Sequence, residues 1–90
     1  MDRSELEERM EEEGALGVPG ANSAIIGLVY LPKEGTSVAV YDRQRLVEWF
    51  MRENEWDVET ADEWVSFNCE GAYLGPGTPL YCDVIDDTDQ

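Results

Sequence analysis

The side chains of this chain that could do chemistry are mostly carboxylates. The sequence holds 21 Asp and Glu against 6 Lys and Arg and has no His, which gives a formal net charge of −15. Carboxylates can transfer protons, bind hard cations or attract cationic partners. A charge of this size repels nucleic acid and anionic membranes, and it attracts basic protein surfaces. We therefore expect a basic protein partner, and no direct contact with nucleic acid or membrane.

Catalysis has little support in the sequence. The usual proton shuttle is missing because there is no His, and the only lysine, Lys33, falls in an expected turn. Asp62 and Glu63 are adjacent, so on a helix they point about 100° apart and cannot flank one substrate bond. We expect a protein that is not an enzyme, with no catalytic residues.

The candidate metal ligands have the wrong spacing. Four aspartates near the end do not follow the alternating pattern of a calcium loop, which favours a solvated tail: Asp83, Asp86, Asp87 and Asp89. Cys69 and Cys82 have no further Cys or His to complete a zinc site. We expect free thiols in a cytoplasmic protein, with no metal and no cofactor.

The cluster Gly71, Gly75 and Gly77 follows an expected helix and has no lysine nearby. A phosphate-binding loop instead lies before a helix, so this cluster indicates a turn.

The acidic charge is segmental. Residues 1–13 and 57–70 each carry −5 and residues 83–90 carry −4, whereas residues 14–32 and 71–82 carry no charge. A cap at Asp57 and a stripe of small and branched residues predict a helix in the middle segment. Its exposed face supplies the candidate partner-binding residues Glu59, Asp62, Glu63 and Glu70.

Trp49, Trp56 and Trp64 are more indoles than a core of this size needs, and Trp is enriched at protein-binding centres. Core packing is the simpler explanation for each. Trp56 is the best candidate for exposure, because it falls in the connection between two expected helices. We add Trp56 to the candidate binding residues.

The fold class expected is α+β. Branched runs at 24–31 and 36–41 flank a turn and predict a hairpin, helices follow after Asp42 and Asp57, and residues 79–85 form an extended run. This order, ββααβ, predicts a small antiparallel sheet covered by a helical hairpin. Residues 1–21 are expected to form an acidic, mobile segment with a short helix capped by Ser4, residues 22–85 the compact domain, and residues 86–90 an acidic tail.

Several motifs resemble those of a group of small uncharacterised bacteriophage and prophage proteins. They are a Tyr-Asp before a helix at Tyr41-Asp42, a Phe-Asn at Phe67-Asn68, and a Gly-Ala-Tyr-x-Gly-x-x-Thr-Pro pattern over residues 71–79. The resemblance covers about residues 24–82 and implies a phage origin and a location in host cytoplasm. It implies no activity, catalytic residue or cofactor.

Two functions from different classes fit these observations. The first is an inhibitor whose carboxylates imitate DNA phosphates on a basic host protein, such as a nuclease or defence protein. The second is a structural, assembly or homo-oligomeric accessory protein that uses the uncharged residues 14–32 as its contact surface. Both are binding roles without catalysis.

Overall fold

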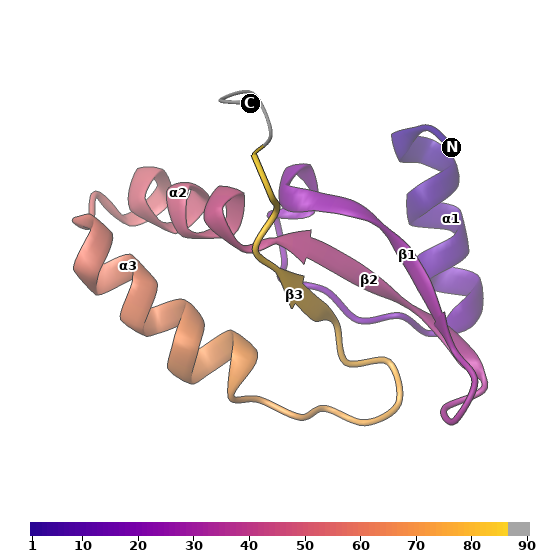
Figure 1. Ribbon diagram of the computed structural model, residues 1–90. Coiled ribbons are helices and arrows are strands. Elements are labelled where there is room, and N and C mark those ends of the chain that lie inside the picture. The colour runs from indigo at the N-terminus through magenta and orange to yellow at the C-terminus, as the bar shows by residue number, and fades with distance from the viewer. Residues whose placement is uncertain (87–90) are drawn as a thin grey trace.

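The computed structural model describes residues 1–86 and has an α+β fold, as the sequence predicts (Figure 1). The acidic tail expected at 86–90 therefore lies almost wholly outside the described residues. The elements in chain order are α1 (Arg3–Glu13), a 3₁₀ turn (Asn22–Ala24), β1 (Ile25–Leu31), β2 (Thr36–Asp42), α2 (Arg43–Asn54), α3 (Val58–Trp64), the π-helical turn η2 (Val65–Glu70) and β3 (Leu80–Cys82).

The β1–β2 hairpin forms as predicted, because the uncharged branched residues on both sides of the turn pair in register. Leu31 pairs with Thr36 and Val29 with Val38 in an antiparallel ladder. The amides of Glu34 and Gly35 both donate to the Leu31 carbonyl, and Gly35 supplies the positive φ of 71° that this turn requires.

The prediction of an antiparallel third strand is wrong. β3 pairs parallel to β2, with Val40 opposite Leu80, so the three-stranded sheet is mixed. The parallel direction follows from the path of the chain. The chain leaves β2 at Asp42, and the two helices and the loop after η2 carry it back, so that β3 begins beside Val40 and runs in the same direction as β2 (Figure 1). β3 also has only three residues, fewer than the expected extended run.

The helical hairpin starts where the sequence indicates. Asp42 accepts a hydrogen bond from the Arg45 amide, and Asp57 accepts one from the Thr60 amide, so each carboxylate caps a helix. The buried residues of the two helices join the core next to Tyr41 of β2, whose ring stacks on Tyr81 of β3 with centroids 5.7 Å apart. These helical core residues are Leu46, Val47, Phe50, Ala61, Val65 and Cys69.

The N-terminal helix is packed more firmly than its narrow apolar stripe suggests. Leu6 and Met10 are only 5% and 8% exposed and belong to the main core cluster. The cap is Asp2 rather than Ser4, because the Asp2 carboxylate accepts from the Glu5 amide. At the other end Glu13 is joined to β2, as its carboxylate accepts from the Ser37 amide at 3.1 Å. α1 therefore has a fixed position against the sheet.

Candidate functional site

The four acids predicted to bind a partner do lie on one continuous helical segment, α3 and η2. All four are exposed: Glu59, Asp62, Glu63 and Glu70. The opposite face of the segment is held by the buried side chains of Ala61, Val65 and Cys69. Val58, a branched residue at the start of α3, does not join this buried face and is 52% exposed.

Arg43 divides these acids into two kinds. Its Nη1 donates to Asp62 Oδ1 at 2.7 Å and its Nε donates to Glu70 Oε1 at 2.7 Å. The hydrogen bonds to Asp62 and then to Glu70 raise the pKa of Arg43, and its side chain is only 16% exposed. Within residues 1–86, Glu59 and Glu63 have no such cationic partner.

The sequence analysis missed Arg43 as part of this surface. Sequence spacing does not show that the start of α2 lies against the end of the next helix. The Nη2 of Arg43 also donates to Ser66 Oγ at 2.9 Å, so one side chain joins α2 to both α3 and η2. Asp62 and Glu70, which Arg43 neutralises, therefore also help to hold α2 against α3 and η2.

The expectation about the exposed indole is wrong. Trp56 is half-buried between Phe50 and Trp64, with ring centroids 6.3 Å and 5.4 Å away. Trp64 is the more exposed indole, at 43%. The connection between α2 and α3 is only a few residues long, so the two helices pack closely and cover Trp56.

An apolar hollow of about 250 Å³ lies beside the same segment. Trp64, Asn68 and Cys69 line one side of it, and Leu74 and Tyr81 contribute from the later chain. Several large apolar side chains around η2 are strongly exposed: Phe67 at 78%, Tyr73 at 72% and Leu74 at 65%. Exposed apolar side chains are typical of interaction surfaces, and π-helical turns occur often at functional sites, so these residues are candidates for contact with a partner.

The hollow is smaller than the roughly 300–1,000 Å³ of typical small-molecule pockets. It is of a size to accept one apolar side chain of a partner. Cys69, which lines it, is a free thiol whose pKa is raised by burial, so it is a poor nucleophile.

A second row of carboxylates, on α1, was missed as a site. Within the described part of the chain, four of its glutamate side chains make no hydrogen bond or ion pair: Glu5, Glu8, Glu11 and Glu12. The signal was in the sequence, since these residues recur three or four apart, but the segment was expected to be mobile. Because Leu6 and Met10 are buried, α1 is held against the core and its carboxylates have fixed positions.

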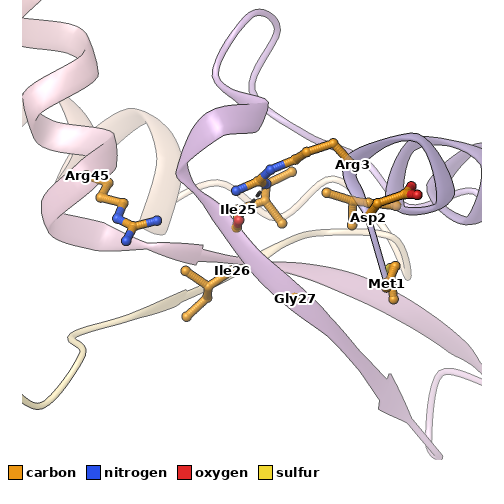
Figure 2. A pocket seen from close by; sticks show the side chains of 8 residues that line it. Met1, Asp2, Arg3, Ile25, Ile26, Gly27 and Arg45 are labelled. Carbon is orange, nitrogen blue, oxygen red and sulfur yellow. Dashed lines mark hydrogen bonds between the residues drawn. The ribbon is translucent and has the colours of Figure 1, made fainter.

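Arg3 and Arg45, two arginines of this region, contact other parts of the fold and not the four glutamates. Arg3 extends away from α1 and its Nη1 donates to the Ile25 carbonyl at 2.7 Å, as Figure 2 shows. Arg3 and Arg45 lie at the rim of a shallow hollow of about 680 Å³ between α1, β1 and α2. Arg45 also lies 3.4 Å from Asp42. Both guanidinium groups are therefore already engaged within the fold.

The described residues contain no group of three side chains that could hold a metal ion, and none of their helices is long and apolar enough to cross a membrane. Both cysteines are free thiols, Cys69 buried and Cys82 exposed. Burial also raises the pKa of Tyr41, whose hydroxyl oxygen accepts from the Val18 amide at 2.7 Å. This hydrogen bond joins β2 to the segment that follows α1.

Comparison with protein-family models, curated proteins and solved structures finds no match to this chain.

Proposed function

We propose that this protein is a non-enzymatic inhibitor that binds the nucleic-acid groove of a basic protein and imitates DNA. The observation that carries the proposal is the row of unpaired carboxylates on α1, held in place by Leu6 and Met10. The unpaired Glu59 and Glu63 of α3 add to it. The resemblance to phage proteins remains a prediction and makes a host nuclease or defence protein the partner of choice.

A docked helix is suited to this role. Residues four apart on a helix are separated by about 6 Å along its axis, so the carboxylates form a regular row, as phosphates do along DNA. Because the backbone of α1 is already ordered, binding does not have to order it again. Attraction between the net charge of −15 and a basic groove would also raise the association rate at low salt.

The apolar residues around η2 give the partner a second point of contact. Phe67, Tyr73 and Leu74 are exposed, and Trp64 lies at the edge of the hollow. Aromatic side chains supply much of the affinity at protein interfaces, whereas exposed charges mainly set the association rate. We assign the charge to steering and the aromatic residues to the lifetime of the complex.

The test is a pull-down from a bacterial lysate at low salt, eluted with a salt gradient, followed by competition between purified partner and double-stranded DNA. The proposal predicts a nucleic-acid-binding protein that this chain releases from DNA. Replacement of Glu5, Glu8, Glu11 and Glu12 by glutamine should weaken binding and flatten its salt dependence. The same replacement at Glu59 and Glu63 should have a smaller effect. A captured partner that binds DNA and this chain at the same time would rule out DNA imitation.

A further inference from the structure

Among residues 1–86, no strand lies beside the outer edge of β1. The strand order is β1-β2-β3, so β1 pairs only with β2. At its ends, the Ile25 carbonyl accepts from Arg3 and the Leu31 carbonyl accepts from the turn. Between these two residues, no backbone group makes a hydrogen bond outside the hairpin ladder within residues 1–86. The edge therefore presents open backbone donors and acceptors.

This edge also lacks most of the features that keep a sheet edge from pairing. Natural edge strands are usually short, charged, interrupted by proline or covered. β1 has seven residues, none charged and none proline, and exposes Ile26, Val29 and Tyr30 at 46%, 42% and 60%. Within residues 1–86, its protection is confined to the first part of the strand, where Arg3 donates to the Ile25 carbonyl and the register is irregular between Ile25 and Gly27. By contrast, β3 at the opposite edge is three residues long and is followed by Asp83.

We propose that this edge pairs with β1 of a second copy, antiparallel and centred on Val29, to join two three-stranded sheets into one. Self-complementarity favours a second copy as the occupant, and charge limits where that copy can approach. Two chains of charge −15 repel each other over most of their surface, and the uncharged residues 14–32 are where they can approach. An antiparallel strand pair is also self-complementary, which a two-fold symmetric dimer requires. This inference stands apart from the proposed function.

Repulsion between the two copies determines whether salt strengthens or weakens the dimer. Salt screens like charges, so the dimer should tighten as salt rises. Binding to a basic partner should weaken under the same change, so the two interactions can be distinguished in one buffer series.

The experiment is sedimentation velocity of the full chain at about 50 mM and about 500 mM NaCl. We expect the association constant of the dimer to rise on the order of tenfold at the higher salt. Val29→Lys should abolish the dimer although it lowers the net negative charge. Leu80→Lys, at a side chain 41% exposed on β3, is the matched control and should leave the dimer intact.

Hydrogen exchange supplies a readout that does not depend on the variants. Amides of β1 that face away from β2 should become protected as protein concentration rises at high salt. A chain that stays monomeric at both salts, a dimer that weakens with salt, or equal loss in both lysine variants would overturn the proposal. A dimer without new protection in β1 would overturn it as well.

Discussion

The two acidic helical segments, α1 and α3 with η2, differ in how many of their carboxylates are paired with arginine. Residues 1–13 and 57–70 each carry −5, so their sequences look equivalent. On the second segment, Arg43 neutralises Asp62 and Glu70 and uses them to hold α2 against α3. On α1, the two arginines bind backbone carbonyls and Glu13, and four glutamates have no partner among residues 1–86.

The difference teaches that formal charge is a poor guide to the charge available for binding. An acid already bonded to a guanidinium must break that contact before it can bind a partner. An acid that projects from a docked helix without a partner has no such cost. The comparison makes α1 the stronger candidate surface and makes the Asp62–Arg43–Glu70 group a stabilising element.

The largest effect should come from removing the anchor of α1. Leu6→Ala leaves a cavity at a side chain that is 5% exposed, and it should lower the free energy of unfolding by about 2–4 kcal/mol. Urea unfolding measures this. Leu74→Ala is the control, since its side chain is 65% exposed and its loss should cost less than about 0.5 kcal/mol. Equal stability of the two variants would mean that α1 is not docked.

Arg43→Met should make the α3 surface resemble α1. It removes the contacts to Asp62 and Glu70, whose side chains are 52% and 38% exposed, so solvent screening limits the loss of stability to about 1 kcal/mol. The two acids are then unpaired, and binding to a basic partner should tighten. Arg45→Met, at a side chain 59% exposed, should change stability little. Weaker binding by Arg43→Met would contradict the comparison.

Two double variants of equal charge separate the two kinds of acid on one segment. Glu59→Gln with Glu63→Gln should reduce affinity for the basic partner several-fold, on the order of 1 kcal/mol, with little change in stability. Asp62→Asn with Glu70→Gln should reduce stability more and affinity less. Isothermal titration and urea unfolding of both proteins provide the measurement. Equal changes of affinity and stability in the two variants would show that the ion pairs with Arg43 do not affect partner binding.

The smallest effect concerns Glu13, which joins α1 to β2. Hydrogen bonding to Ser37 lowers the pKa of Glu13 below its ordinary value, so the folded protein binds this proton less tightly than the unfolded chain. Its contribution is present above the unfolded pKa and is lost as pH falls through the lowered folded pKa. The stability difference between wild type and Glu13→Gln should therefore shrink between about pH 7 and about pH 3. Urea midpoints that differ equally at both pH values would refute this.

Local signals in the sequence predicted most of the elements. The hairpin follows from branched runs around a turn, and the caps at Asp42 and Asp57 follow from side chains that satisfy free amides nearby. The direction of β3 was not predictable in this way, because it depends on where the chain returns after η2. Among the site residues, exposed positions such as Glu59 could be predicted from helical spacing.

The missing parts of the site depend on contacts between distant residues. Arg43 and Glu70 are 27 positions apart, and Thr36 bonds to the Glu13 carbonyl across 23 positions. The periodicity of a sequence does not show contacts between residues so far apart. The docking of α1 was missed for the same reason, since two buried side chains suffice when Arg3 and Glu13 add hydrogen bonds at its ends.

The most direct test of the account is the salt dependence of partner binding after removal of the α1 row. In the variant that carries Gln at Glu5, Glu8, Glu11 and Glu12, the slope of log affinity against log salt should flatten and affinity should fall more than tenfold. A charge-matched variant with Gln at Glu34, Glu48, Glu53 and Glu55 changes the net charge equally and should retain most of the affinity. Equal losses in the two variants, or an unchanged slope in the first, would contradict the claim that the docked row on α1 forms the binding surface.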